Sequence, residues 1–341
     1  MRTETPGPTN AGPRREDIVP SLVSVIIPAF NAERWLAETI ASVRDQSYKR
    51  VEIIVSDDGS TDGTLPIARA AADIVVQGTG GGPGGARNGG MRVARGEYLQ
   101  FLDADDLLAP DKIARQVAAL FTSGGDVAWE AFDNLVPLPN GEFERAERVA
   151  PELGPDLEAS LLTARGFIQI GALLVHRSRR TDTLWFPEGR DVVEDVRYMM
   201  ELARAGCRFV STETDEPGLL FRQHTGVRHS KRPVESFALA CAANADWARA
   251  NWESHGELSP VRRAALSEAY AFAARQLAAI NEPAFHEIAS RGMSVGPEFL
   301  QELPAHLRWL SMLVGYERAE SLAVRWRRAK RLHDTLPVDR P

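Results

Sequence analysis

The chain has 341 residues, 44% of them hydrophobic, which is enough for one large domain or two moderate ones with a substantial core. Its 40 Lys and Arg residues against 47 Asp and Glu residues give a net charge of −7, which argues against nucleic acid as the main partner. The two cysteines, Cys207 and Cys241, provide neither a disulfide framework nor zinc-ligand spacing and are typical of a reducing cytoplasm.

Residues 1–20 are rich in Pro, Gly, Thr and charge and lack the apolar segment of a signal peptide. We expect a disordered leader there. No apolar run approaches the roughly 18 residues of a membrane span. These features predict a cytoplasmic protein.

Four apolar segments then alternate with helical patterns. "SLVSVIIPAFN" (21–31) predicts a buried strand ended by Pro28, and strands are also expected at "VEIIV" (51–55), "DIVVQ" (73–77) and "EYLQFLD" (97–103). This alternation indicates a mostly parallel central sheet covered on both sides by helices. In such sheets ligands bind at the carboxyl ends of the strands.

The segment "GTGGGPGGARNGG" (78–90) predicts a glycine-dense loop, followed by a helix around 87–95. It matches neither G-x-x-x-x-G-K-[ST] nor G-x-G-x-x-G, so neither nucleotide-binding fingerprint applies. Glycines let a backbone approach a phosphate closely, but the loop alone favours a flexible linker.

Polar residues follow three of the expected strands, at 28–31, 57–58 and 103–106. Asp103 and Asp105 have the D-x-D spacing that suits a hard divalent cation, and Mg²⁺ or Mn²⁺ usually shares its shell with water and phosphates. The alternative is that Asp105 and Asp106 cap the next helix.

The second part of the chain is less regular. We expect a loop or hairpin over 126–160, a strand pair or long strand over 166–178, and a helix over 189–206. This helix carries Glu194 and Asp195, of which one is a candidate general base; the alternative is that they stabilise the helix dipole.

Cationic residues cluster at 221–231, in "FRQHTGVRHSK", where His224 could complete a metal shell. A single histidine is more often structural than ligating. From about 236 to 333 the chain is Ala- and Arg-rich and predicts helices.

Taken together and in order, these motifs resemble family 2 glycosyltransferases of the GT-A fold. The resemblance rests on "VSVIIPAFNAERWLAETIASVRDQSY", "VEIIVSDDGSTDGT", "GGARNGGMRVARGEYLQFLDADD" and "VVEDVRYMMELARAG". It covers 23 to about 120 closely and continues loosely to about 230. The sequence departs from the family at Thr79, where many relatives carry Asn.

The resemblance implies a nucleotide-sugar donor, with uracil the usual base and thymine an alternative. Pro28 and Phe30 would flank the base, and Asp58 would form a hydrogen bond with it. Arg87 would lie near the base or diphosphate, and Asp103 would contact the ribose or the metal.

The same resemblance assigns Asp105 to Mn²⁺ or Mg²⁺ bound through the diphosphate, and brings His224 close to that metal. Asp195 would be the base that deprotonates an acceptor hydroxyl, so that direct displacement inverts the anomeric carbon. The implied organisation is a GT-A domain over 21–232, with a donor half at 21–120 and an acceptor half at 121–232, followed by a helical C-terminal region at 233–341.

Two other functions compete with an inverting glycosyltransferase. A sugar-phosphate nucleotidyltransferase usually carries a glycine-rich loop with Arg and Lys after its first strand, whereas "PAFNAE" follows here. A non-catalytic nucleotide-sugar-binding protein would not need the D-x-D and a candidate base.

The acceptor is open among a growing cell-surface glycan, a lipid-linked molecule and a small natural product, and the Ala- and Arg-rich composition suggests a GC-rich bacterial genome. The basic segment 316–333 places Leu322 and Trp326 on one helix face. We expect that helix to pack on the domain or form a homodimer contact; the alternative is contact with an anionic membrane surface, at its inner face.

Overall fold

The computed structural model describes residues 21–78, 80–178, 181–189, 193–212, 214, 216–224 and 233–335. The expected leader at 1–20, Thr79 and the cations of 225–232 lie outside the described residues.

The central sheet has seven strands in the order β10-β6-β9-β4-β1-β2-β3 and is mostly parallel, as predicted. β1 is parallel to both of its neighbours, β2 and β4, while β9 runs antiparallel to β4 and β6. The strands are β1 (Val23–Ala29), β2 (Val51–Asp57), β3 (Ile74–Gln77), β4 (Tyr98–Phe101), β6 (Val127–Trp129), β9 (Leu173–His176) and β10 (Phe209–Ser211).

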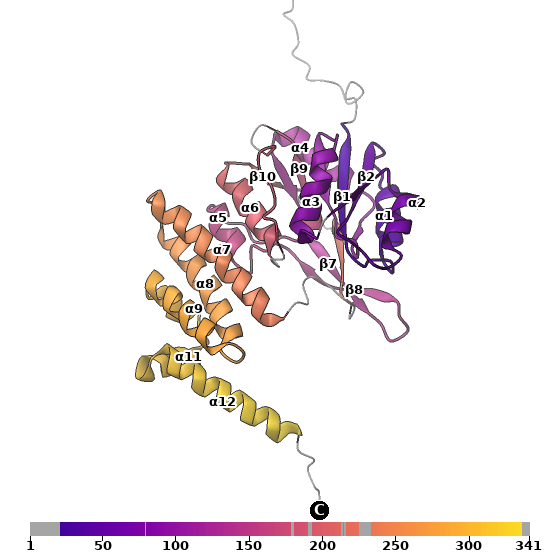
Figure 1. Ribbon diagram of the computed structural model, residues 1–341. Coiled ribbons are helices and arrows are strands. Elements are labelled where there is room, and N and C mark those ends of the chain that lie inside the picture. Colours follow the sequence, from indigo (N-terminus) through magenta and orange to yellow (C-terminus); the bar gives the residue numbers. More distant parts are fainter. Residues whose placement is uncertain are drawn as a thin grey trace, which may run out of the picture.

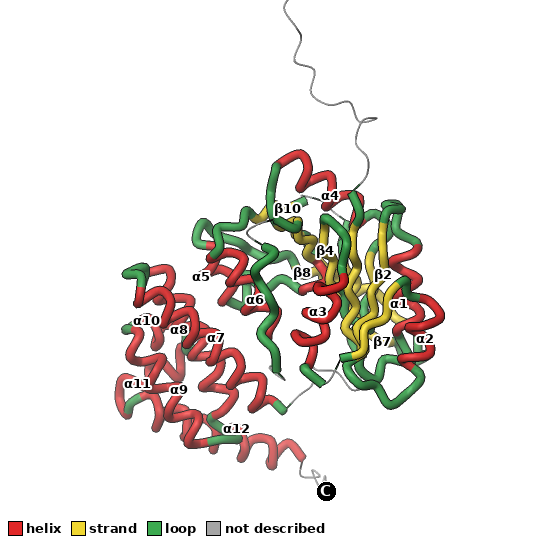
Figure 2. The backbone as a smooth tube through the Cα atoms, turned by 45° about the horizontal axis from the view of Figure 1, so that its top comes forward, coloured by secondary structure: helices red, strands yellow, loops and turns green. Residues whose placement is uncertain are grey.

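Helices cover both faces of this sheet. Figure 2 shows the strands between α1 and α2 on one side and α3 and α6 on the other. The helices of this part are α1 (Leu36–Arg44), α2 (Thr64–Ala71), α3 (Gly82–Val93), α4 (Lys112–Ser123), α5 (Leu157–Leu162) and α6 (Glu194–Arg204). The architecture is the predicted α/β fold, which buries the central strands β1 and β2 almost completely.

A second sheet of four strands has the order β5-β11-β7-β8. Its strands are β5 (Leu107–Leu108), β7 (Phe132–Pro137), β8 (Phe143–Val149) and β11 (Leu219–Arg222). β7 and β8 form the hairpin expected within 126–160, whereas the same stretch also contains α5, which was not predicted. Over 166–178 a short 3₁₀ turn, Ile170–Ala172, leads into β9 in place of a strand pair.

The prediction for the glycine-rich segment is wrong, because α3 begins at Gly82, inside the expected loop. A Cβ at Gly90 would collide with the side chain of Ile26 in β1, and a Cβ at Gly84 would collide with the carbonyl oxygen of Pro187. These glycines therefore serve close packing of a helix on its neighbours, and the segment is not a flexible linker. Pro28 also does not end its strand, since it pairs with Ser56 within β1.

The C-terminal part is helical throughout its described residues and lies beside the α/β part (Figure 1). Its helices are α7 (Val234–Ser254), α8 (Pro260–Leu277), α9 (Glu282–Val295), α10 (Glu298–Gln301), α11 (Ala305–Val314) and α12 (Tyr316–Thr335). Among the described residues, none of the helices combines the length and the apolar character that crossing a bilayer requires.

Buried polar contacts attach these helices to the α/β part. The indole of Trp252 in α7 donates a 3.0 Å hydrogen bond to Glu158, and Arg262 in α8 forms ion pairs with Asp156 and Glu158 at 2.8 and 3.2 Å. Trp252 is fully buried, so this contact belongs to a shared core. The first two helices of the C-terminal region, α7 and α8, are therefore packed against the α/β part around α5.

Candidate active site

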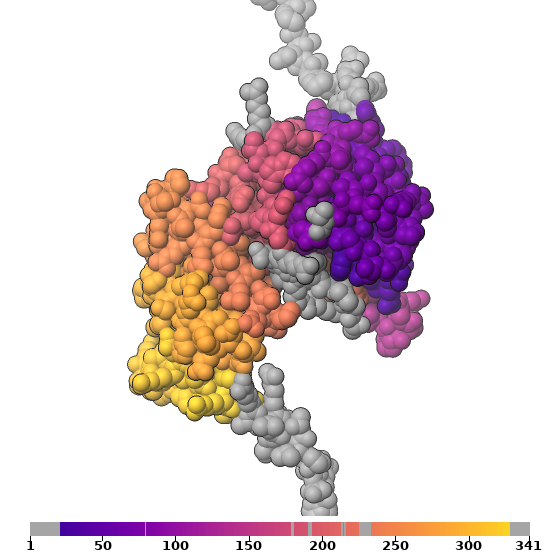
Figure 3. Space-filling view, viewed as in Figure 1, coloured from indigo at the N-terminus to yellow at the C-terminus, as the bar shows by residue number. Residues whose placement is uncertain are grey.

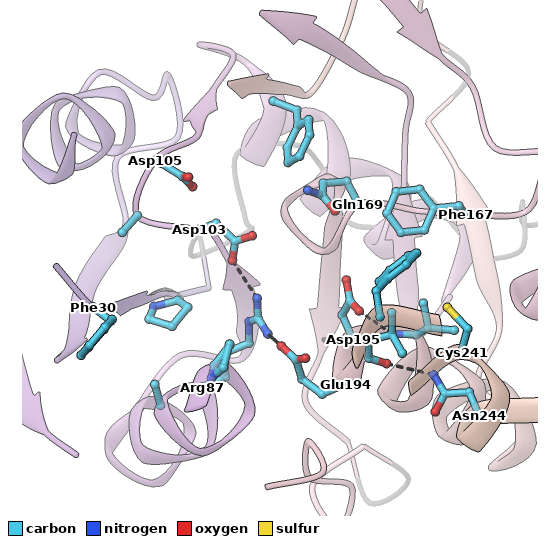
Figure 4. A pocket seen from close by; sticks show the side chains of 18 of the residues that line it. Phe30, Arg87, Asp103, Asp105, Phe167, Gln169, Glu194, Asp195, Cys241 and Asn244 are labelled. Atoms are coloured by element: carbon cyan, nitrogen blue, oxygen red, sulfur yellow. Dashed lines mark hydrogen bonds and ion pairs between the residues drawn. The ribbon is translucent and has the colours of Figure 1, made fainter. Parts of the chain in front are cut away.

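A pocket of about 970 Å³ opens at the carboxyl ends of β1, β2 and β4, with α6, α7 and α8 on its other side. All eight residues singled out in the sequence line it: Pro28, Phe30, Asp58, Arg87, Asp103, Asp105, Asp195 and His224. Figure 4 shows Phe30, Asp103 and Asp105 on one side, Cys241 and Asn244 on the other, and Asp195 between them. The structure thus brings the eight residues together, while their individual roles remain proposals.

The rim on the sheet side carries an aromatic ring. Phe30 follows β1 directly, lines the pocket and is 46% exposed. A rigid aromatic side chain in this position can stack on a planar ring of a ligand. Pro28, in the same strand, lines the pocket beside it.

Asp58 holds the start of α3. Its carboxylate accepts hydrogen bonds from the backbone N–H groups of Gly80 and Gly81, both at 3.0 Å, and of Gly82 at 2.9 Å. A carboxylate at a helix N-terminus satisfies N–H groups that have no partner within the helix. Any contact of Asp58 with a nucleotide base would be made in addition to this capping role.

Arg87 joins the end of β4 to the start of α6. Its guanidinium donates to Asp103 and to Glu194, each at 2.7 Å, and only 3% of the residue is exposed. Burial alone would lower the pKa of Arg87, but the two carboxylates outweigh it and raise the pKa. Arg87 is therefore permanently charged, and its guanidinium holds the carboxylates of Asp103 and Glu194 next to each other.

Glu194 also belongs to the site, although the sequence analysis assigned a role only to its neighbour Asp195. Adjacent helical residues point about 100° apart, which favoured only one of the pair for the cleft. In the structure both side chains line the pocket. The carboxylate of Glu194 pairs with Arg87, whereas that of Asp195 does not. A buried arginine needs a negatively charged partner, and this requirement could have pointed to Glu194 as a second site residue.

Asp195 has the electrostatics of a base that works near neutral pH. Its carboxylate accepts a 2.8 Å hydrogen bond from the backbone N–H of Val196 in the first turn of α6. Burial, followed by the negative charge of Glu194, raises the pKa of Asp195 to about 7, although Arg87 partly opposes this shift. Such a group can accept a proton and still be partly ionised at pH 7.

Asp105 and His224 come together from distant parts of the chain. The imidazole Nε2 lies 2.9 Å from a carboxylate oxygen of Asp105, and the ring packs against Trp35 with centroids 5.0 Å apart. A carboxylate oxygen suits Mn²⁺ and Mg²⁺, which leave further positions to water and phosphate, and an imidazole beside it favours the transition metal Mn²⁺ over Mg²⁺. Among the described residues no group of three or more His, Cys, Asp or Glu could hold a metal, so this pair would rely on the ligand for the rest.

Asp106 explains why these two residues meet. It is 1% exposed, and its carboxylate accepts the backbone N–H of Arg222 at 2.9 Å, while the guanidinium of Arg222 donates to the carbonyl of Asp105 at 3.0 Å. The helix-cap interpretation of these aspartates is wrong, because α4 begins only at Lys112. The carboxylate instead ties β5 to β11, which places His224 next to Asp105.

A mixed α/β sheet with acidic residues at the carboxyl ends of its parallel strands is the arrangement that the resemblance to the GT-A fold predicted. Residues 24–136 match the family described as Glycosyl transferase family 2, so the chain carries a domain of that family, as the resemblance predicted. The match disfavours the nucleotidyltransferase alternative.

Several curated proteins resemble this domain. An "Uncharacterized glycosyltransferase" of Haemophilus influenzae is 41% identical over 102 residues, which cover 28% of this chain and 41% of that protein. The Escherichia coli UDP-Glc:alpha-D-GlcNAc-diphosphoundecaprenol beta-1,3-glucosyltransferase WfaP is 39% identical over 28% of this chain and 40% of its own length. The succinoglycan biosynthesis protein ExoO of Rhizobium meliloti is 33% identical over 34% of each protein. The chain therefore spans less than half the length of these relatives.

Two solved structures extend the likeness over nearly the whole chain. TarS of S. aureus, in complex with UDP-GlcNAc, has a TM-score of 0.62 at 21% identity and covers 89% of both chains. The mannosyltransferase PcManGT from Pyrobaculum calidifontis has a TM-score of 0.50 at 21% identity and covers 91% of this chain and 90% of that one. At such identities the likeness establishes the fold.

Proposed function

We propose that the protein is an inverting glycosyltransferase that moves a sugar from a nucleoside-diphosphate donor to an acceptor hydroxyl. The observation that carries this proposal is the arrangement of Asp195 and the Asp105–His224 pair on one pocket. A base and a candidate cation site thus flank the space that a donor sugar would occupy. The family 2 domain supports the same reaction class.

In this proposal Asp195 takes the proton from the acceptor hydroxyl, whose oxygen attacks the anomeric carbon opposite the departing diphosphate. One displacement forms the new glycosidic bond, breaks the bond to the diphosphate and inverts the anomeric carbon. A divalent cation held by Asp105 and His224 would supply stabilisation for the charge on the leaving group. Arg87 keeps Asp103 and Glu194 in position, so that the two sides of the pocket stay at a fixed distance.

We assign the donor contacts to Pro28, Phe30, Asp58, Arg87 and Asp103. The exposed ring of Phe30 would stack on the base. The TarS complex contains UDP-GlcNAc and the PcManGT complex contains GDP-Man and Mn²⁺, which supports a nucleotide-sugar donor and a divalent cation. A uracil base is our first expectation and thymine the second.

We further propose a role in bacterial cell-surface polysaccharide synthesis. The names of two relatives support it, since one is a glucosyltransferase for a diphosphoundecaprenol-linked acceptor and the other a succinoglycan biosynthesis protein. Such a role would place the protein at the inner face of a membrane.

A surface at the far end of the helical region suits this location. On α11 and α12 several large apolar side chains are exposed by 47–72%: Trp309, Met312, Leu313, Leu322 and Trp326. Helix α12 contains six Lys or Arg residues and three Asp or Glu residues, although the whole chain has a charge of −7. We propose that this surface, the α11–α12 patch, contacts an anionic membrane, since apolar and basic side chains together favour such an interface.

The first experiment is a thermal-shift titration with UDP, dTDP and GDP, each with and without Mn²⁺. A ligand that binds the native state raises the melting temperature, so one diphosphate should produce a metal-dependent rise. The absence of a shift with every diphosphate in the presence of Mn²⁺ would refute the donor assignment.

A further inference from the structure

The half of the pocket away from the donor residues is lined by large apolar side chains, with the charged residues Glu268, Arg275 and Glu302 among them. It is formed by α5, by the segment that follows it, and by α7 and α8. Its apolar residues are Leu161, Leu162, Phe167, Phe237 and Phe272. Figure 4 shows Phe167 on this side, across the pocket from Phe30 and Asp105.

Phe237 and Phe272 form an aromatic pair on neighbouring helices. Their rings meet edge to face, with centroids 5.9 Å apart and planes at 89°. Phe272 is 41% exposed, whereas Ala271 and Ala273 beside it on α8 are buried in the helical core. The ring of Phe272 therefore points out of that core, toward the pocket that it lines, and a ligand could cover its exposed apolar surface.

This wall is held in a fixed relation to Asp195. The amide of Asn244 in α7 donates a 3.0 Å hydrogen bond to the carbonyl of Val193, just before α6 begins. The carboxylate of Glu268 in α8 accepts the backbone N–H of Ala164 at 2.9 Å. Both helices are thus tied to the segments that carry the base and Phe167.

Thr163, Arg275 and Glu302 also line this half, whereas other polar groups in it are engaged within the protein. The amide of Asn244 and the carboxylate of Glu268 make the bonds just described, and burial raises the pKa of the Cys241 thiol to about 12, which keeps it neutral. Gln169 lies beside Phe167 and offers an amide for one hydroxyl. The phenyl rings themselves offer no hydrogen bond, so the part of an acceptor that lies against them is better matched by an apolar group than by sugar hydroxyls.

We infer that the acceptor carries an aromatic or hydrocarbon group next to the hydroxyl that receives the sugar, and that Phe167, Phe237 and Phe272 bind this group. The inference rests on the proposed function and names the acceptor class for the same site. The apolar group belongs either to a small aromatic molecule or to a lipid-linked intermediate, because both present the same chemistry to the phenyl rings.

The test uses three glycosides of one sugar as probes: methyl, 4-nitrophenyl and, below its micellar concentration, dodecyl. Binding is measured by saturation-transfer NMR titration with UDP and Mn²⁺ present. We expect at least one apolar glycoside to bind about tenfold more tightly than the methyl glycoside. A preference for 4-nitrophenyl would indicate a small aromatic acceptor and a preference for dodecyl a lipid-linked one. Equal binding of all three probes would overturn the inference.

Variants connect the preference to the aromatic wall. Phe272→Ala should reduce the apolar preference severalfold, and Phe272→Leu should restore part of it. Phe121→Ala is the matched control, because Phe121 is a 54% exposed phenylalanine on α4 that does not line the pocket. An unchanged preference in Phe272→Ala, or an equal loss in the control, would contradict the assignment.

The same samples separate this inference from the proposed function. UDP binding is measured independently by its metal-dependent thermal shift, which Phe272→Ala should leave unchanged. If UDP binds but no apolar preference exists, only the acceptor class is wrong. If no nucleoside diphosphate binds, the proposed function fails, whatever the glycosides do.

Discussion

The acidic cluster of the pocket is organised around one cation. Arg87 contacts Asp103 at the end of β4 and Glu194 at the start of α6, and this leaves Asp195 as the carboxyl with the raised pKa. Two neighbouring carboxyls in different surroundings acquire different tasks, because one is held by the arginine and the other can exchange a proton near neutral pH. Glu194 reaches Arg87 and Asp195 does not, and this difference explains why we assign the proton transfer to Asp195.

Replacing the proposed base tests its role most directly. Asp195→Asn should lower kcat by about 10²- to 10⁴-fold, since the amide cannot accept the acceptor proton. UDP affinity, measured by thermal shift, should stay within about twofold because the amide keeps the shape of the side chain. Glu201→Gln, on α6 but outside the pocket, is the control. Turnover at the wild-type rate in Asp195→Asn would remove Asp195 from the mechanism.

The pH dependence of turnover follows from the same carboxyl. The pKa of Asp195 is raised from its ordinary value of 3.8 to about 7, so the carboxylate that accepts the proton accumulates as the pH rises through 7. We expect kcat to rise with pH, to reach half of its maximum near pH 7 and to level off about one pH unit higher. A profile recorded from pH 5.5 to 9 checks this, and a rate that is flat between pH 5.5 and 7 would be incompatible with Asp195 as the base.

If Asp105 and His224 bind the metal, substitution of either residue should weaken Mn²⁺ binding. His224→Ala and Asp105→Asn should each weaken Mn²⁺ affinity in the presence of UDP by at least about tenfold, because each removes a proposed ligand. Titration with Mn²⁺, followed by the thermal shift, measures this. His176→Ala is the control, since His176 in β9 does not line the pocket. Unaltered Mn²⁺ affinity in both site variants would exclude the pair as the metal site.

At the level of elements, α3 shows how a glycine-rich sequence can form a packed helix. Gly84 and Gly90 lie where a Cβ would collide with Pro187 and Ile26, whereas a Cβ at Gly85 would meet nothing within 4 Å. The glycines along one helix thus have different reasons to be present. The carboxylate of Asp58 supports the start of the helix by accepting the N–H groups of Gly82 and of the two residues before it.

Two alanine substitutions in α3 should have opposite effects. Gly84→Ala should destabilise the protein by about 1–3 kcal/mol, since the clash is with a backbone carbonyl that cannot move freely. Gly85→Ala should stabilise it by about 0.5–1 kcal/mol, because alanine favours the helix and restricts the unfolded chain. Urea unfolding of both variants measures their free energies of unfolding against the wild type. Equal effects of the two substitutions would show that the close contact at Gly84 is not a constraint.

The sequence predicted the α/β architecture, and the eight residues that it singled out line one pocket. For those at strand ends the signal is local, whereas Arg87 and Asp195 lie on helices and were chosen mainly through the resemblance. Asp103 and Asp105 directly follow an apolar strand, and in a parallel sheet such ends meet at one edge. The start of α3 was missed because glycine has a low intrinsic helix propensity, and tertiary packing overrides it here. The roles of Glu194 and Asp106 depend on partners far away in the chain, which local patterns do not reveal. The aromatic wall from α7 and α8 carried no motif and became visible only when the helices packed beside the sheet.

At the scale of the whole molecule, the two ends of the helical region face different surroundings. α7 and α8 line the pocket, whereas α11 and α12 lie at the end away from the sheet, as the space-filling view shows in yellow (Figure 3). Leu322 and Trp326, which the sequence placed on one helix face, are 47% and 65% exposed. As expected, α12 packs on the helical region, through the buried Tyr316 and Ala319, whereas its face with Leu322 and Trp326 is exposed.

The α11–α12 patch predicts binding to anionic vesicles. The protein should co-sediment with vesicles that contain phosphatidylglycerol more than with neutral phosphatidylcholine vesicles, because α12 has an excess of three basic residues. Raising the ionic strength should weaken the binding, since salt screens charges over about 10 Å at 0.1 M. Replacing Leu322 and Trp326 by serine should reduce the bound fraction severalfold, while Val261→Ser, at a 59% exposed position on α8, should not. If the protein instead forms a dimer that these serine substitutions dissociate, and ignores both kinds of vesicle, the patch is a contact between two copies of the chain and the membrane proposal is wrong.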